Sequence, residues 1–155
     1  MKMDVKRLES LIKGLKAVDG SKVEIGFFED STYPNGTPVA LVAAWNEYGT
    51  RFHPERPFMR ETFTSKEVQA LIQHRLKSVL AVALNGGRGI QKLLADIGKQ
   101  IEAQMKDKIE HYPGHNSLAT IMRKGFDDPL KDTGKMLESV KFKISQKGMQ
   151  ALGAV

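Results

Sequence analysis

Four histidines and a pair of adjacent aspartates are the residues of this sequence best suited to acid–base or metal chemistry. His111 and His115 flank a Tyr-Pro-Gly turn, and Asp127 and Asp128 follow a short way along the chain. Imidazole and carboxylate groups could together hold a metal ion or move a proton. Their spacing matches no recognised set of ligands, and His74 lies in an expected helix with no carboxylate or histidine one turn later. The sequence therefore gives no positive argument for a metal site.

One glycine-rich stretch could in principle hold a phosphate. Residues 85–89 read NGGRG and precede an expected helix. A phosphate-binding loop needs GxxxxGK followed by Ser or Thr, or GxGxxG after a strand, and this stretch has neither pattern. The chain also lacks the GxSxG and HExxH motifs of hydrolases and metalloproteases. We therefore expect no enzyme activity, no cofactor and no bound metal.

The most unusual stretch runs from Ala44 to Phe63 and reads AWNEYGTRFHPERPFMRETF. It leaves an expected helix at a glycine and then carries two prolines among arginines and aromatic residues, which indicates an extended segment. Aromatic and arginine side chains are enriched at the centres of protein interfaces, and arginine makes bidentate contacts that suit packing between subunits. We expect Trp45 and Phe58 in the core, with His53 and the arginines at an interface.

The composition narrows the class of protein. The 155 residues include no cysteine, so disulfides and thiolate metal sites are excluded. The charged start, MKMDVKRLES, predicts no signal peptide, and no apolar run is long enough to predict a membrane span. The formal net charge of +6 is spread along the chain without a block of like charges. Such a chain suits proximity to nucleic acid or to an acidic partner, or simply a solvated basic surface.

Apolar residues recur at helical spacing in four segments. The first covers residues 4–18, with Asp4 as its cap, and the second opens at Thr37-Pro38 and ends at Gly49. A third helix after Ser65 and a fourth that reaches residue 109 are joined by an Asn-Gly-Gly turn. This pair predicts a long antiparallel helical hairpin.

Alternating apolar residues predict two strands, at residues 22–28 and 140–144. Residues 111–130 show little periodicity beyond a short turn of helix after Ser117, and a short helix capped by Asp132 or Thr133 follows. Loops of that length are usually functional or disordered. Because two strands alone make a marginal sheet, we expect more strands from the arginine-rich segment, the tail or another copy of the chain.

The predicted fold class is α+β, with a small, mostly antiparallel sheet packed against a long helical hairpin plus shorter helices. We expect a single domain over residues 1–145. Residues 146–155 are expected to form a C-terminal tail that is flexible or contributes to an interface.

Two stretches of the chain, taken together, resemble a known family. Residues 23–63, VEIGFFEDSTYPNGTPVALVAAWNEYGTRFHPERPFMRETF, resemble the strand, turn, helix and "NE-aromatic-GT…PxRPF-M/L-R" signature of the neck or tail-completion proteins of tailed bacteriophages. Residues 121–144, IMRKGFDDPLKDTGKMLESVKFKI, resemble the second signature of that family. The resemblance covers roughly residues 20–145, with the helical hairpin between the two signatures.

The resemblance implies a structural virion protein of a phage or prophage, without enzymatic activity. Such proteins form a homo-oligomeric ring, expected here to be a hexamer or dodecamer, at the junction between head and tail, and they assemble in the cytoplasm of the host bacterium. The implied partners are the head-closure or connector protein, the tail-tube or tail-terminator protein, and the genomic DNA that passes through the ring without sequence-specific contact. No membrane partner is implied.

Ring contacts join two unlike surfaces of neighbouring subunits, and the arginine-rich segment and the 111–130 loop are the candidates for them. The residues expected at a subunit or partner interface are Arg51, His53, Arg56, Arg60, Tyr112, His115, Arg123 and Lys124. The residues expected to form the structural core of the two signatures are Trp45, Tyr48, Phe58, Phe63, Leu130 and Leu137.

Two other functions stay open. A small nucleic-acid-binding module of phage origin would bind free DNA as a monomer, with a steep dependence on salt, although the dispersed charge argues against it. A small hydrolase that used His111, His115 and Asp127 would need these groups in one pocket with strongly perturbed ionisation.

Overall fold

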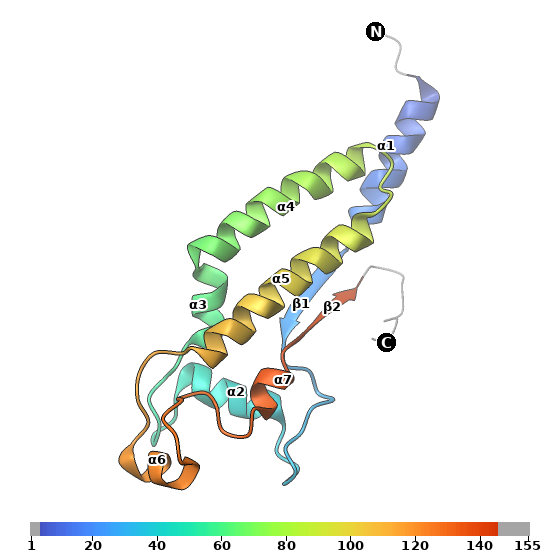
Figure 1. Ribbon diagram of the computed structural model, residues 1–155. Coiled ribbons are helices and arrows are strands. Elements are labelled where there is room, and N and C mark those ends of the chain that lie inside the picture. The colour runs from blue at the N-terminus through green and yellow to red at the C-terminus, as the bar shows by residue number, and fades with distance from the viewer. Residues whose placement is uncertain (1–3, 146–155) are drawn as a thin grey trace. The chain divides into compact units, whose positions relative to one another are not determined.

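The structure is a computed structural model, and it describes residues 4–145 (Figure 1). Its elements are α1 (Val5–Val18), β1 (Lys22–Gly26), α2 (Val39–Tyr48), α3 (Phe58–Thr64), α4 (Lys66–Leu84), α5 (Ile90–Glu110), α6 (Leu118–Lys124), α7 (Lys135–Glu138) and β2 (Lys141–Ser145). In the described residues β1 and β2 pair as a two-stranded antiparallel sheet. The fold is therefore α+β, as predicted. The expected role of residues 146–155 lies outside the described residues.

Contacts within the chain group it into two compact units, and the single domain expected over residues 1–145 stays a prediction. Among the described residues, unit 1 takes 4–24, Lys66–Gln100 and 142–145. Unit 2 takes Ile25–Ser65 and Ile101–Lys141. Both signature stretches therefore lie largely in unit 2, and most of the helical hairpin lies in unit 1.

In unit 1, α1 packs closely on the end of α4. Asp4 caps α1 as predicted, because its carboxylate accepts from the backbone N–H of Lys6 at 3.2 Å. Gly14 is buried, and a Cβ at this position would overlap the carbonyl oxygen of Ala83 in α4. The glycine thus lets the two helices approach to backbone contact.

The first half of α5 packs against β2 in the same unit. Gly98 of α5 lies under the ring of Phe142, and a Cβ at position 98 would overlap this ring. A small residue on the helix therefore makes room for an aromatic residue on the strand.

The core of unit 2 is built around Phe58, which is fully buried and meets the ring of Phe27 edge-on at a centroid distance of 6.0 Å. Of the residues expected in the core, Phe58 and Leu130 are buried, and Phe63 and Leu137 are partly buried against the same cluster. The buried cluster consists of Val39, Ala43, Phe58, Met105, Ile109, Leu130, Met136 and Val140.

Trp45 and Tyr48 do not lie in the core, contrary to expectation. Their side chains are 47% and 72% exposed. The buried face of α2 instead carries Val39, Ala43 and Glu47, which lie one turn apart. The helix is apolar on almost every side, so its pattern could not indicate which face is buried.

α3 was not predicted, because Pro54 and Pro57 indicated an extended segment. The helix begins directly after Pro57. Its first N–H groups are capped by Glu47 of α2, whose carboxylate accepts from the backbone of Met59 at 2.8 Å and of Arg60 at 3.0 Å. A cap that comes from another helix leaves no local signal in the sequence.

The other predicted elements are present with shifted ends. β1 ends at Gly26 rather than at residue 28, and the N-cap of α7 is Gly134, with φ of 78°, instead of Asp132 or Thr133. α6 begins at the predicted place, with Ser117 as its cap. Within the described residues the arginine-rich segment adds no strand to the sheet; Thr50 and His53 form only an isolated bridge.

Candidate functional site

The two signatures meet in unit 2 through Arg56. Its Nη1 donates to the carbonyl oxygen of Pro129 at 2.9 Å, and its Nη2 donates to Oδ1 of Asn116 at 3.3 Å. The hydroxyls of Ser31 and Ser139 lie 2.6 Å apart and form a second link. Residues that are far apart in the chain are thus held on one surface.

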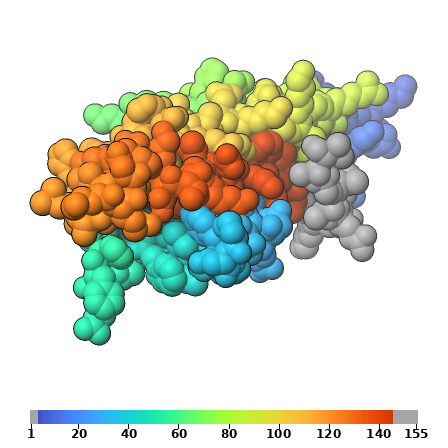
Figure 2. Space-filling view, turned by 60° about the horizontal axis from the view of Figure 1, so that its bottom comes forward, coloured from blue at the N-terminus to red at the C-terminus, as the bar shows by residue number. Residues whose placement is uncertain are grey.

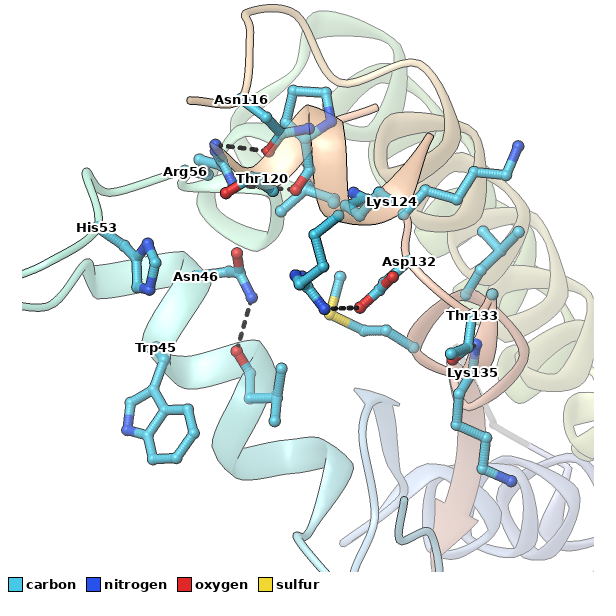
Figure 3. Close-up of a pocket in the computed structure, with 18 of the residues that line it drawn as sticks. Trp45, Asn46, His53, Arg56, Asn116, Thr120, Lys124, Asp132, Thr133 and Lys135 are labelled. Carbon is cyan, nitrogen blue, oxygen red and sulfur yellow. Dashed lines mark hydrogen bonds and ion pairs between the residues drawn. The ribbon is translucent and has the colours of Figure 1, made fainter. Parts of the chain in front are cut away.

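Beside Arg56 lies a groove of about 560 Å³ (Figure 3). Trp45 and Asn46 of α2 and His53 from the following turn stand on one side of it. The other side carries Lys124 of α6 and Asp132 from the segment before α7. Both sides belong to unit 2, so the groove is a feature of that unit alone.

The groove is predominantly cationic. Lys124 donates from Nζ to the carbonyl oxygen of Asp128 at 2.6 Å, and its removal from water lowers its pKa. Arg123 is more exposed and reaches Asp132 only at 3.5 Å. Among the described residues the lining holds five basic side chains and one carboxylate, namely Arg56, Arg123, Lys124, Lys131, Lys135 and Asp132.

Asp127 fixes the chain at the rim of the groove. Its Oδ1 accepts from the backbone N–H of Asn116 at 2.6 Å, and its Oδ2 lies 2.7 Å from Nδ1 of His115. The bond from the Asn116 backbone and then that from His115 hold the pKa of the Asp127 carboxyl below its usual value. The imidazole of His115 stays 88% exposed, so this pair orders the loop and leaves the ring at the surface.

The histidines that the sequence grouped together do not share a site. His111 lies 3.1 Å from the carboxylate of Asp107 at the end of α5, whereas His115 is paired with Asp127. Of these groups only His115 lines the groove. Across residues 4–145 no cluster of three or more His, Cys, Asp or Glu side chains could hold a metal ion. The arrangement therefore offers the hydrolase alternative no support.

Arg60 is bound within its own unit. Its Nε donates to Oε1 of Glu47 at 3.0 Å, and its Nη2 donates to the carbonyl oxygen of Glu47 and to Oε2 of Glu55. The hydrogen bonds to Glu55 and Glu47 raise the pKa of Arg60 above its usual value. The guanidinium also lies over the ring of Tyr48 at 5.5 Å. The side chain therefore fastens α3 to α2.

A tight turn at residues 50–53 projects beside the groove (Figure 2). The hydroxyl of Thr50 accepts from the backbone N–H groups of Phe52 and His53, each at 3.1 Å. At the tip the guanidinium of Arg51 lies 4.8 Å from the ring centre of Phe52, which is 76% exposed. The turn thus presents an aromatic ring and a cation to solvent.

The structure gathers most of the residues expected at an interface around the groove. Tyr112 lies elsewhere, with its hydroxyl 3.4 Å from Glu61, and its pKa is raised by burial and then by Glu61. Asn116 was missed, because nothing in its sequence neighbourhood indicates its contact with Arg56. Those that line the groove are His53, Arg56, His115, Arg123 and Lys124, with Arg51 in the adjoining turn.

No helix in residues 4–145 combines the length and the apolar character needed to cross a membrane. Searches against protein-family models, curated proteins and solved structures found no match for this chain.

Proposed function

We propose that the protein is a structural virion component of a tailed phage or prophage, which forms a ring at the head–tail junction around the DNA channel. The observation that carries the proposal is the contact between the two signatures, in which Arg56 of the first bonds to Pro129 of the second. A pair of signatures that folds into one surface supports a shared role for them. The proposal assigns no reaction and no cofactor to this surface.

Exposed apolar side chains support self-association. Monomeric proteins rarely expose extended apolar rows, so such rows mark contact surfaces. One row follows a face of α1, a second follows a face of α4, and a shorter one lies on α6. The residues are Val5, Leu8, Ile12 and Leu15 on α1, Leu76, Leu80 and Leu84 on α4, and Leu118 and Met122 on α6.

The proposal is tested by native mass measurement and negative-stain imaging of the purified full-length chain over a range of concentrations. We expect closed rings whose mass is a whole multiple of 17.3 kDa, corresponding to a hexamer or dodecamer. Heterologous contacts that close into a ring give such a discrete mass, whereas open contacts give a ladder of masses. A chain that stays monomeric at every concentration would refute the ring.

The second candidate is a nucleic-acid-binding module, which the surplus of basic residues in the groove favours. A gel-shift titration of duplex DNA at several salt concentrations distinguishes the two candidates. Binding by a monomer with a steep salt dependence would support the module. Rings that bind DNA weakly and without sequence preference fit a channel wall.

A further inference from the structure

We infer that the groove of unit 2 binds an acidic and partly apolar peptide segment of a partner protein. The inference does not rest on the proposed ring, because it follows from the groove itself. Its support comes from the acceptors of the basic side chains, from one buried amide, and from the apolar side of the groove.

Two of the five basic groups in the wall, Arg56 and Lys124, are bonded to neutral acceptors, whereas Arg123 and Lys131 lie near the carboxylates of Asp132 and Glu110. Arg56 donates to the carbonyl oxygen of Pro129 and to the amide oxygen of Asn116, and Lys124 donates to the carbonyl oxygen of Asp128. In the described chain neither cation has a carboxylate within ion-pair distance. Partial burial lowers the pKa of both groups. A carboxylate in the groove would compensate this charge and form charge-assisted hydrogen bonds.

Asn116 supplies a second, independent indication. The residue is 9% exposed and its side chain lines the groove; its Nδ2 makes no hydrogen bond of ordinary geometry in the described structure, although the side chain lies near the carboxylate of Asp127 and helps to lower the pKa of that carboxyl. The orientation of the amide is set by Arg56, which can only donate and therefore faces Oδ1. Buried donors without an acceptor are rare in native proteins. A carboxylate or a peptide carbonyl oxygen in the groove would give Nδ2 a better-placed acceptor.

The apolar side of the groove favours a peptide over a nucleic acid. Trp45 lines it with 47% of its surface exposed, and Val42 and Met136 line it as well. A duplex, which presents its sugar–phosphate backbone, would satisfy the cations and leave Trp45 uncovered, whereas a peptide offers carboxylate and apolar side chains together. The unpaired bases of a single strand could stack on Trp45, so single-stranded DNA is a competitor in the test. The volume of about 560 Å³ is that of a pocket for a few side chains.

The acidic segment comes from another protein rather than from a second copy of this chain. The chain carries a net charge of +6, so a second copy offers a surplus of cations rather than of carboxylates. Asp30, next to Glu29, lies 3.7 Å from Lys141. Asp127, next to Asp128, holds His115 and Asn116. Asp127 is therefore held within its own subunit, and the net charge favours an acidic partner over a second copy.

Trp45 is the single tryptophan of the sequence, so its fluorescence reports directly on the groove. The probe is a blocked octapeptide of alternating glutamate and leucine, titrated into the full-length protein at low salt. We expect a saturable change in emission. The same peptide with glutamine in place of glutamate should bind at least about tenfold more weakly, because charge-assisted bonds are lost. Equal binding of the two peptides, or no binding, would overturn the inference.

Variants locate the binding site. Arg123→Gln with Lys124→Gln should weaken binding of the glutamate peptide by about tenfold or more, whereas Lys77→Gln with Lys92→Gln makes the same charge change on exposed residues of unit 1 and should not. Equal loss in both pairs would show that only net charge matters and would refute the site. If the protein bound single-stranded or duplex DNA more tightly than the peptide, the groove would be assigned to nucleic acid. If the peptide inhibited self-association of the protein, the groove would be assigned to a second copy of the chain. Either result contradicts the inference. Peptide binding can be measured on the monomer or on the ring. A failure to bind the peptide therefore leaves the ring proposal unaffected.

Discussion

The side chain of Glu47 joins α2 to α3 through several hydrogen bonds. Its buried carboxylate accepts two backbone N–H groups of α3 and the Nε of Arg60. We expect Glu47→Ala to lower the free energy of unfolding by about 2–4 kcal/mol, because it leaves these donors without an acceptor. Urea unfolding followed by circular dichroism measures the change.

Glu55→Ala is the matched control for this prediction. Glu55 is largely exposed and meets only Nη2 of Arg60, at 3.0 Å. Exposed ion pairs contribute little, so this variant should lose less than about 1 kcal/mol. If both variants lost the same amount, Glu47 would not be the cap that the structure shows.

Of the residues expected at an interface, Arg56, His115 and Lys124 line the groove, and their role at an interface stays a prediction. Residue types alone did not predict Asn116 or the role of Glu47. Asn116 meets a residue 60 positions away, and Glu47 acts on residues 12 and 13 positions away. A polar side chain whose partners are distant in sequence carries no periodic or motif signal, so its function emerges only from the folded chain.

At the scale of elements, local caps explain which helices the sequence could predict. Asp4 and Ser117 each bond to an N–H within three residues, and the helices after them begin where expected. α3 has its cap on another helix and was missed. Trp45 and Tyr48 were misplaced for a related reason, since burial of α2 is decided by its neighbours and not by its own pattern.

The approach of α1 to α4 gives a prediction about these elements. An exposed helical glycine is usually stabilised by replacement with alanine, by up to about 1 kcal/mol. At Gly14 the added Cβ would overlap the backbone of Ala83, so we expect Gly14→Ala to destabilise the protein by about 1–3 kcal/mol. Thermal unfolding measures the effect. Lys13→Ala, at the exposed neighbouring position of the same helix, should be nearly neutral, and a more stable Gly14→Ala would contradict the close approach.

At the scale of the whole molecule, the sequence predicted the α+β class and the two long helices joined by a glycine turn, because both follow from periodicity. The grouping of contacts into two compact units has no such signal in the sequence. One boundary falls at Ser65, between α3 and α4, and the other three fall inside α5 and inside the two strands. Such a division depends on which residues far apart in the sequence contact one another. Hydrophobic periodicity and turn residues do not indicate these contacts.

At the projecting turn of residues 50–53, a substitution can change assembly without changing the stability of the fold. Phe52 is 76% exposed and contacts Arg51, so Phe52→Ser should leave the unfolding midpoint unchanged. If the proposed ring uses this turn, the loss of one aromatic anchor, worth about 1–3 kcal/mol, should weaken assembly by roughly tenfold or more in native mass titrations. Phe52→Leu keeps an apolar side chain and should largely retain assembly. Rings of undiminished stability from Phe52→Ser would remove this turn from the interface, and because the variant folds normally, that result could not be attributed to a damaged subunit.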